Sequence, residues 1–339
     1  MGFGGKIVWS SVFKNINNIE KKKVFVSYTP KFSDLIKGYY FDRSVSLKND
    51  EIFKNNPRLI FNDCTKKLNL TDKIDSFINK ILRLLGLNIL FENVIINWSK
   101  SINKKKDFIL IHIDITQYSL AEKVYSNRFD WVKHVHWVDY LAEMFITKPV
   151  NTKFNRKGEI YFTETEKNKV KRILEKFNID HGSNFIVLNP TSKKDYFGEL
   201  RNWLFSNWQE LIYKINEEYE NVNLIQIGLE SDKKLDGVNS LNGKLTFREC
   251  VLLIKYSQLY IGHEGGLMHA ANIVTSNSVI IWGGVTLPDF AGYTDNSNII
   301  CNYVDCAPCG NFGWCDNNHI CMNQISVEKV YNNISSMIT

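Results

Sequence analysis

Four cysteines near the end of the sequence have a spacing that suits metal binding. Cys306, Cys309, Cys315 and Cys321 follow the pattern C-x2-C-x5-C-x5-C. Four thiolates at such separations can form one tetrahedral site for zinc or iron, and a site with four protein ligands has a structural role. His319 could replace one thiolate, and free or partly paired thiols are the alternative interpretation.

A second stretch of the sequence could bind an anion. Glu264-Gly265-Gly266 follows an apolar run and precedes a short helical pattern that contains Leu267 and His269. Glycines allow a ligand to approach the backbone closely, and the free N–H groups of a helix N-terminus suit a phosphate. The alternative is an ordinary tight turn in which His269 is only a packing residue.

The pattern of apolar residues predicts the elements that position these side chains. Short apolar runs alternate with helical patterns, which indicates α/β layers around parallel sheets. We expect strands at 24–28, 108–113, 185–188, 223–227, 259–261 and 278–282, and helices at 72–87, 131–145, 164–177, 207–217, 247–256, 267–274 and 326–337. Thr163 and Thr246 each begin a Thr-x-x-Glu capping box, which marks a helix start. The turn at Gly265 then lies at a strand's carboxyl end, where open α/β sheets bind ligands.

Composition and charge exclude several classes of protein. The chain of 339 residues is 44% hydrophobic and 23% charged, which is typical of a globular protein. Its net charge is +6, but the lysines are scattered, so we expect no nucleic-acid partner. No window approaches the ~18 apolar residues of a membrane helix, and no signal peptide is visible. We therefore expect a cytoplasmic protein with at most peripheral contact at the inner membrane face, where the lysine runs 21–23 and 104–106 could touch anionic lipid.

The glycine-rich turn resembles a motif of glycosyltransferase family 9, the ADP-heptose heptosyltransferases. That family has Asp-(Thr/Ser)-Gly-(Leu/Met)-x-His-(Leu/Ala)-Ala, then a strand that ends in an aromatic residue and Gly. The corresponding residues here are Glu264-Gly265-Gly266-Leu267-Met268-His269-Ala270-Ala271 and Trp282-Gly283. The resemblance implies that Glu264, Gly265, Gly266, Leu267 and His269 bind the donor, with Glu264 in place of the family's Asp.

A strand-loop segment further upstream resembles the part of the family that holds the diphosphate. There a strand ends in a Thr/Ser pair, and Lys-x-Trp follows shortly before the next helix. Thr191 and Ser192 match the pair, and Arg201 of Arg-Asn-Trp stands where the Lys is found, after a longer loop. The resemblance implies that these three residues hold the diphosphate, with Lys193 and Lys194 as substitutes for Arg201.

Two more segments resemble the family. One is Gln-Ile-Gly-Leu-Glu-Ser-Asp at residues 226–232. The family has an acidic residue just after the Gly of this segment, and its carboxylate accepts hydrogen bonds from ribose hydroxyls; here Glu230 and Asp232 are the two candidates for that role. It also has a Cys-rich segment before an Ile-Ser-x-Glu-x-Val sequence that opens the last helix, as at Ile325–Val330.

The start of the sequence departs from the family. Heptosyltransferases begin with a strand and (Met/Leu)-Gly-Asp, whose Asp is the proposed general base; here the strand is missing, and Gly5 stands where the Asp belongs. The glycine-rich start suits a loop. Asp114, after the predicted strand 108–113, is the first candidate for the base, and a structural strand-end carboxylate is the alternative.

The resemblance implies an α/β fold of the GT-B type, with two Rossmann-like doubly wound domains facing a cleft. Residues 1–177 would take the acceptor, and 178–325, with the Cys-rich segment 301–321, the nucleotide sugar; the helix in 326–339 would pack back. The implied reaction is inverting transfer of heptose from ADP-heptose to a hydroxyl of a glycan or protein, in lipopolysaccharide, capsule or protein glycosylation, with Arg201 and Asp114 as catalytic residues and no catalytic divalent metal. The alternatives are a catalytically impaired nucleotide-sugar-binding protein and a transferase for a different nucleotide sugar.

Overall fold

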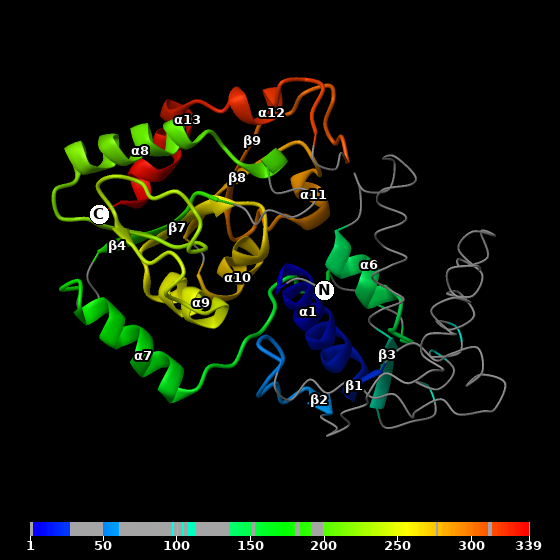
Figure 1. Ribbon diagram of the computed structural model, residues 1–339. Coiled ribbons are helices and arrows are strands. Elements are labelled where there is room, and N and C mark those ends of the chain that lie inside the picture. Colours follow the sequence, from blue (N-terminus) through cyan, green and yellow to red (C-terminus); the bar gives the residue numbers. More distant parts are fainter. Residues whose placement is uncertain are drawn as a thin grey trace, which may run out of the picture. The chain divides into compact units, whose positions relative to one another are not determined.

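In the computed structural model, six parallel strands of the C-terminal half form one sheet (Figure 1). They are β4 (Phe185–Asn189), β5 (Asn223–Gln226), β6 (Asn239–Ser240), β7 (Leu259–His263), β8 (Ser278–Trp282) and β9 (Asn298–Cys301). Their order across the sheet is β6-β5-β4-β7-β8-β9. Along the chain, β5 and β6 are added on one side of β4. The chain then crosses to β7, on the other side of β4, and adds β8 and β9 beyond it. Doubly wound folds of this order bind ligands where the direction reverses.

The structure describes residues 3–27, 50–60, 97, 100, 104, 108–112, 136–148, 150, 153–179, 184–191, 199–275, 277–310 and 314–338. It forms two units: a C-terminal unit of residues 1–8, 129–136 and 162–339, and an N-terminal unit of residues 9–128 and 137–161. The predicted helix at 72–87 lies outside the described residues. The four strands predicted for the second half are confirmed, with ends that differ by at most two residues.

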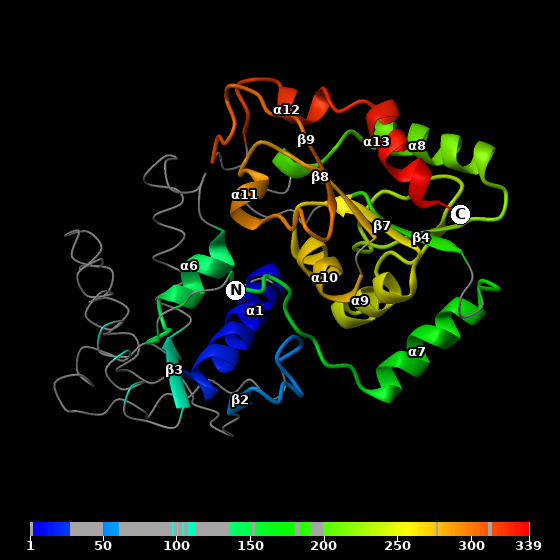
Figure 2. The same ribbon diagram turned by 180° about the vertical axis from the view of Figure 1, so that it is seen from behind.

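Helices cover both faces of the six-stranded sheet (Figures 1 and 2). On one face lie α8 (Phe205–Glu218) and α13 (Val327–Ile334), and on the other α9 (Phe247–Tyr256) and α10 (Gly266–Val274). Side chains alternate along a strand, so Ile186 and Leu188 of β4 join the α8 side of the core. Trp208, at the start of α8, is fully buried there. A sheet buried on both faces explains why its strands are continuous apolar runs.

Three short helical turns and two edge strands have no strong sequence pattern. The turns are η1 (Glu199–Arg201), α11 (Pro288–Ala291) and α12 (Ile320–Asn323), and the chain ends with η2 (Ser335–Met337) after α13. The edge strands are β6 and β9, which flank the apolar central strands. Edge strands need less apolar character because one side of their backbone faces no further strand.

The helix α7 (Glu164–Glu175) packs on α9 of the C-terminal unit. Its predicted capping box is confirmed: Glu166 N–H donates to Thr163 Oγ1, and Thr163 N–H donates to Glu166. Glu166 also faces the buried guanidinium of Arg248, with Nε–Oε1 and Nη2–Oε2 distances of 2.6 and 3.0 Å. The same guanidinium lies 4.9 Å from the Phe162 ring centroid. Residues 162–177 accordingly fall in the C-terminal unit, whereas the sequence analysis places the domain boundary at residue 177.

The last helix also belongs to the C-terminal unit. Tyr331 of α13 donates to Glu218 of α8 across 2.5 Å, and Trp203 donates its indole N–H to the carbonyl of Ile325 across 2.7 Å. The predicted helix in residues 326–337 is confirmed as α13 followed by η2, and it packs on α8.

The N-terminal unit contains a second parallel sheet. Its order is β2-β1-β3, with β1 (Lys23–Ser27), β2 (Leu59–Ile60) and β3 (Phe108–His112). The two predicted strands are confirmed as β1 and β3. Of the helix predicted at 131–145, the structure has α6 (Trp137–Glu143), while 131–135 lie outside the described residues.

The glycine-rich start of the sequence is a helix, α1 (Phe3–Glu20), so the predicted loop is wrong. Trp9, Phe13 and Ile16 are buried at intervals of three and four residues, which is the spacing of one helix face. Phe13 packs against Phe53, with ring centroids 5.4 Å apart. This buried face stabilises the helix despite the glycines at its start.

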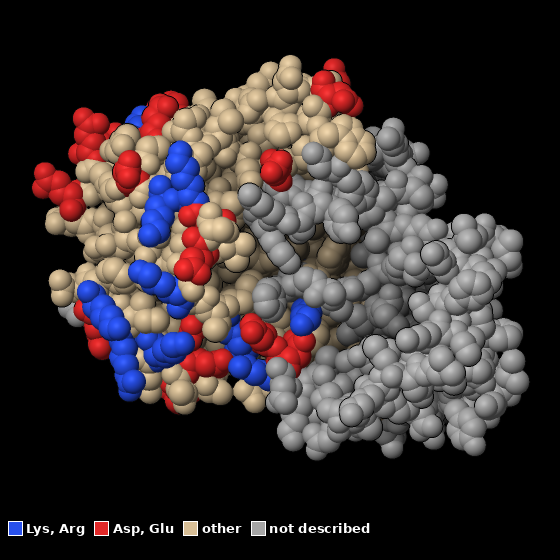
Figure 3. Space-filling view, viewed as in Figure 1, with Lys and Arg blue, Asp and Glu red and all other residues tan. Residues whose placement is uncertain are grey.

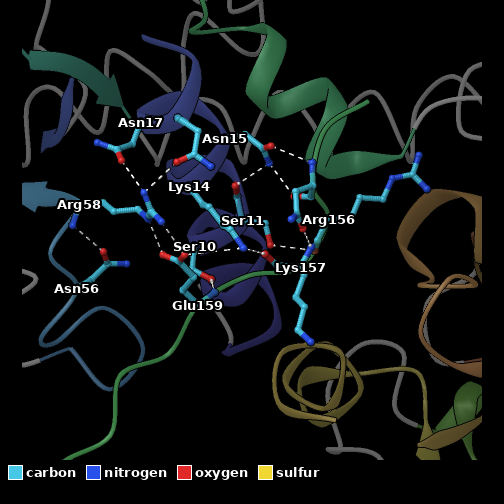
Figure 4. Close-up of polar contacts among 12 residues, drawn as sticks. Ser10, Ser11, Lys14, Asn15, Asn17, Asn56, Arg58, Arg156, Lys157 and Glu159 are labelled. Carbon is cyan, nitrogen blue, oxygen red and sulfur yellow. Dashed lines mark hydrogen bonds and ion pairs between the residues drawn. The ribbon is translucent and has the colours of Figure 1, made fainter. Parts of the chain in front are cut away.

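An extended segment, residues 153–161, is tied to α1 by polar contacts within the N-terminal unit (Figure 4). Asn15 and Asn155 exchange two hydrogen bonds of 2.7 and 2.9 Å. Glu159 N–H donates to Ser10 Oγ, and the carboxylate of Glu159 accepts from Arg58 Nε and Nη2 at 2.6 and 2.9 Å. Buried serine and asparagine side chains on α1 are thus satisfied by this segment.

On the face shown in Figure 3, the acidic and basic side chains of the described residues lie interspersed, so charge is locally balanced there. Lys169 of α7 pairs with Glu249 of α9, with an N–O distance of 2.6 Å. No helix in the described ranges combines the length and apolar character needed to cross a membrane.

The pairing of Glu166 with Arg248 generates a stability prediction. Glu166→Ala removes the carboxylate that faces a guanidinium only 2% exposed, and we expect a loss of about 3 kcal/mol in the free energy of unfolding. Glu164→Ala, on the same helix turn, removes only a surface pair with Lys167 and should leave stability nearly unchanged. Urea unfolding followed by tryptophan fluorescence measures both. Equal losses in the two variants would contradict the assigned role of Glu166.

Candidate functional site

The reversal of strand order brings two predicted site segments together. Asn189, the last residue of β4, pairs in register with Gly262 of β7, so the residues that follow both strands emerge side by side. The Asn189 side-chain amide donates to the carbonyl of Ile227 at 3.1 Å and to that of Thr191 at 3.3 Å. These bonds hold Thr191 at the end of β4, next to the turn that begins at Glu264.

A buried ion pair joins the two segments. Arg201 Nη2 lies 3.2 Å from Glu264 Oε1, and the two side chains are 16% and 7% exposed. Thr286, from the loop after β8, donates to the same carboxylate oxygen at 3.2 Å. The sequence assigned Arg201 and Glu264 to separate contacts with the ligand; the structure shows that they also contact each other. The carboxylate thereby orients the guanidinium by a charge-assisted hydrogen bond.

A histidine that the sequence analysis missed fixes the backbone beside Arg201. Trp203 N–H donates to His263 Nε2 at 2.9 Å. Burial lowers the pKa of His263 to about 3, so the ring is neutral at physiological pH and its Nε2 can accept. The ring of Trp208 packs edge-on against it, with centroids 5.4 Å apart. The only sequence signal for His263 is its position directly before Glu264 at a strand end.

The turn after β7 leaves a helix N-terminus open. Gly265 is the N-cap of α10, a helix of nine residues, and as a glycine it has no side chain to accept from the N–H groups of the first turn. A Cβ on Gly265 would meet no other heavy atom within 4 Å in the described part of the chain. Gly266 and Leu267 are half-buried in the first turn of α10. An anion can therefore approach this backbone closely.

His269 lies one turn further along α10 and is 7% exposed. Its Nδ1 is 2.7 Å from the hydroxyl of Tyr293. Burial and the charge of Arg201 lower the pKa of His269 to about 3, so this ring is also neutral.

Glu230 and Asp232, the two candidates for the ribose contact, differ in their surroundings in the loop after β5. Asp232 Oδ2 accepts from Leu229 N–H at 2.7 Å, so this carboxylate closes its own turn. It occupies the space beside Gly228, where a Cβ would lie 2.5 Å from the same oxygen. Glu230 is exposed. The geometry thus gives Asp232 a local structural contact and leaves Glu230 facing solvent.

The Cys-rich segment packs on the loop after β8. Cys309 N–H donates to the carbonyl of Gly284 at 2.8 Å, and a Cβ on Gly284 would lie 3.2 Å from Cys321 Sγ. Burial raises the pKa of Cys321, a backbone hydrogen bond from Gly284 lowers it, and the charges of Cys309, Cys315 and Cys306 raise it further. Among the described residues, however, no three His, Cys, Asp or Glu side chains are close enough to hold a metal ion.

The sequence analysis also missed Cys301, at the end of β9. Burial raises the pKa of its thiol to about 11, and Cys321 contributes to the rise. Two predicted site residues, Ser192 and Asp114, lie outside the described residues, and Gly5, which stands where the family has its Asp, is part of α1.

Comparisons with known proteins identify the family. The model described as "Glycosyltransferase family 9 (heptosyltransferase)" matches residues 125–313, more than half of the chain. The glycosyltransferase family 9 protein from Veillonella parvula is 14% identical and superposes with a TM-score of 0.61, over 99% of this chain and 94% of that one. This similarity confirms the predicted α/β fold of the GT-B type. No curated protein sequence matches significantly.

Two further solved structures are similar over smaller parts. Escherichia coli ADP-heptose lipopolysaccharide heptosyltransferase II is 17% identical, with a TM-score of 0.47 over 62% of this chain; the chain spans 63% of the length of that relative, less than two thirds. The iron-containing dodecameric glycosyltransferase TibC of E. coli H10407 is 19% identical, with a TM-score of 0.37 over 46% of each chain.

Proposed function

The chain belongs to glycosyltransferase family 9, and from this premise we propose that it transfers heptose from ADP-heptose to an acceptor hydroxyl. The observation that carries the proposal is the site at the reversal of strand order. There Arg201 pairs with Glu264, and Thr191 and the N-terminus of α10 follow two adjacent strands that pair in register. A cation and free backbone N–H groups suit the diphosphate of a nucleotide sugar.

In this proposal Arg201 is the principal diphosphate ligand, and Glu264 and Thr286 hold its guanidinium in place. Thr191, Ser192 and the N–H groups at Gly266 and Leu267 donate further hydrogen bonds. Fixed donors and a fixed cation stabilise the negative charge that develops on the departing diphosphate. The proposed reaction therefore uses no catalytic divalent metal. His269, whose ring is neutral, contributes a donor or acceptor rather than a charge.

We assign the ribose contact to Glu230 rather than to Asp232. The Asp232 carboxylate is occupied by the N–H of Leu229, whereas Glu230 is exposed beyond the end of β5. In doubly wound folds an acidic residue beyond the second strand accepts from ribose hydroxyls, and β5 is the second strand of this sheet. This placement supports a nucleotide with a free ribose.

The proposed chemistry is one displacement at the anomeric carbon. The acceptor oxygen forms the new bond to that carbon, the bond to the diphosphate oxygen breaks with its electron pair, and a base takes the acceptor proton. Asp114 remains the first candidate for the base. The acceptor is a hydroxyl of lipopolysaccharide, capsule or protein, and the protein would act in the cytoplasm or at the inner membrane face. A different donor sugar is the alternative, because the described contacts concern only the nucleotide and diphosphate.

We further propose that Cys306, Cys309, Cys315 and Cys321 hold a structural zinc or iron. The support is the spacing of the four cysteines and the half-buried position of each thiol. In this proposal the metal lies next to the loop that carries Thr286, because Cys309 and Cys321 pack on Gly284 of that loop. Metal binding would draw the thiols together and stiffen that loop.

The donor assignment is tested by calorimetric titration with ADP and with adenosine. Arg201→Gln should weaken ADP binding by about 10- to 100-fold, the loss expected for a charged hydrogen-bond partner, and leave adenosine binding unchanged because adenosine has no phosphate. Glu230→Gln should weaken both ligands equally. The matched control is Arg172→Gln on the exposed side of α7, which should change neither.

A double variant distinguishes two reasons why ADP binding could weaken in Arg201→Gln: loss of the guanidinium itself, and the unpaired carboxylate that it leaves behind. Arg201→Gln leaves the buried Glu264 carboxylate without the guanidinium, whereas Arg201→Gln combined with Glu264→Gln removes both charges. We expect the double variant to bind ADP as weakly as the single one. Normal ADP binding by the double variant would refute the role of Arg201, and equal affinities for ADP, UDP and GDP would refute ADP as the donor nucleotide.

The metal proposal is tested by elemental analysis of the purified protein. We expect about one zinc or iron per chain, and loss of both metal and thermal stability in Cys306→Ser combined with Cys309→Ser. Cys250→Ser, which changes a cysteine of α9 outside the segment, is the control and should keep the metal. A metal-free wild type whose melting does not change in the double variant would contradict the site.

A further inference from the structure

Two contacts join the segment that carries Arg201 to the end of β7. The first is the ion pair between Arg201 and Glu264, at 3.2 Å. The second is the hydrogen bond from the backbone N–H of Trp203 to His263 Nε2, at 2.9 Å. Trp203 follows Arg201 by two residues, and His263 directly precedes Glu264. The two contacts therefore connect the same two short stretches of chain, and together they limit the rotation of one stretch against the other.

The same segment also rests on two other parts of the C-terminal unit. The carbonyl oxygen of Leu200 packs so closely on Gly283 that a Cβ there would lie 3.0 Å from it, and a side chain would press on the segment. The indole N–H of Trp203 donates to the carbonyl oxygen of Ile325 at 2.7 Å, just before α13. The backbone is thus anchored on both sides of Arg201, at Leu200 and at Trp203.

Stability alone gives little reason for an imidazole at residue 263. The Nε2 of His263 accepts from a backbone N–H, so the single proton of the neutral ring is on Nδ1. That nitrogen is buried and has no hydrogen-bond partner among the described residues, which destabilises the fold. A leucine would avoid this cost, but it would leave the N–H of Trp203 without its acceptor. The two costs are of the same kind, so the distinguishing contribution of His263 is the contact with Trp203.

We propose that His263 is a positioning residue of the donor site, which holds the backbone after Arg201 so that the guanidinium keeps its place against Glu264 and faces the nucleotide diphosphate. The ligand part of this inference rests on the proposed function. An arginine side chain has several rotatable bonds, so an ion pair at its tip fixes it only if the backbone that carries it is also fixed. A guanidinium held in this way loses less freedom when an anion binds.

Limited digestion with trypsin, which cleaves after arginine, measures the freedom of the segment at the bond between Arg201 and Asn202. We expect cleavage there to be about 3- to 10-fold faster in His263→Leu than in the wild type, the usual effect of one neutral hydrogen bond. His263→Gln should leave the rate unchanged, because its amide oxygen can accept in place of Nε2. Cleavage after Lys234, which is exposed in the loop after β5, is the internal reference. Mass spectrometry of the fragments gives both rates.

Calorimetric titration shows whether this freedom matters to the ligand. His263→Leu should bind ADP about 3- to 10-fold more weakly and adenosine equally well, because only the diphosphate contacts Arg201 in the proposal. Added to Arg201→Gln, the same change should cause no further loss, as expected for two residues that act through one contact. The matched control is Tyr331→Phe, which removes a buried hydrogen bond to Glu218 between α13 and α8 and should change neither cleavage nor affinity.

The outcomes separate the positioning role from the proposed function. Unchanged cleavage after Arg201 in His263→Leu, or the same increase in His263→Gln or Tyr331→Phe, would overturn the positioning role. An equal loss of ADP and adenosine binding in His263→Leu would also overturn it, because the effect would then be a general loss of structure. A wild type that binds no ADP would contradict the proposed function, and the cleavage rates would still decide whether His263 holds the segment.

Discussion

The reversal of strand order between β4 and β7 is the constraint on which the site depends. From β4 the chain continues to β5 and β6 on one side of the sheet, and from β7 it continues to β8 and β9 on the other. The connections that follow β4 and β7 therefore leave in opposite directions, so the carboxyl ends of both strands stay open. Register places Asn189 beside Gly262, and therefore Thr191 and Glu264 emerge together. Every contact of the proposed donor site is built outward from that opening.

Buried charge then couples the loops around the opening. Glu264 is 7% exposed, and a buried carboxylate is costly unless it is paired. Arg201 and Thr286 supply partners from the loops after β4 and β8, so three connections share one carboxylate. His263 adds a fourth contact by accepting from Trp203. The guanidinium is thus held before any ligand binds, which reduces the ordering that binding would otherwise require.

Sequence patterns predicted the elements whose causes are local and missed those that depend on distant residues. The strands β4, β7 and β8 are continuous apolar runs, and the capping boxes at Thr163 and Thr246 are complete within one helical turn. The sequence therefore predicts these strands and helix starts without knowledge of the fold. The helix α1 was missed because burial of Trp9 and Phe13 outweighs its glycines. The boundary near residue 162 depends on Glu166 meeting Arg248, 82 positions away. Family motifs identified Arg201 and Glu264 singly, but their pairing, and the contacts of His263 and Tyr293, required the fold.

The central claim is that this site holds the donor for sugar transfer, and mass spectrometry of the acceptor tests it most directly. The purified protein would be incubated with ADP-heptose and an extract that contains lipopolysaccharide, capsule precursors and proteins. The account predicts an acceptor whose mass increases by one heptose residue, with release of one ADP for each sugar transferred and no need for added divalent metal. ADP-heptose that stays intact with every acceptor, or transfer only from a nucleotide sugar with another base, would contradict it.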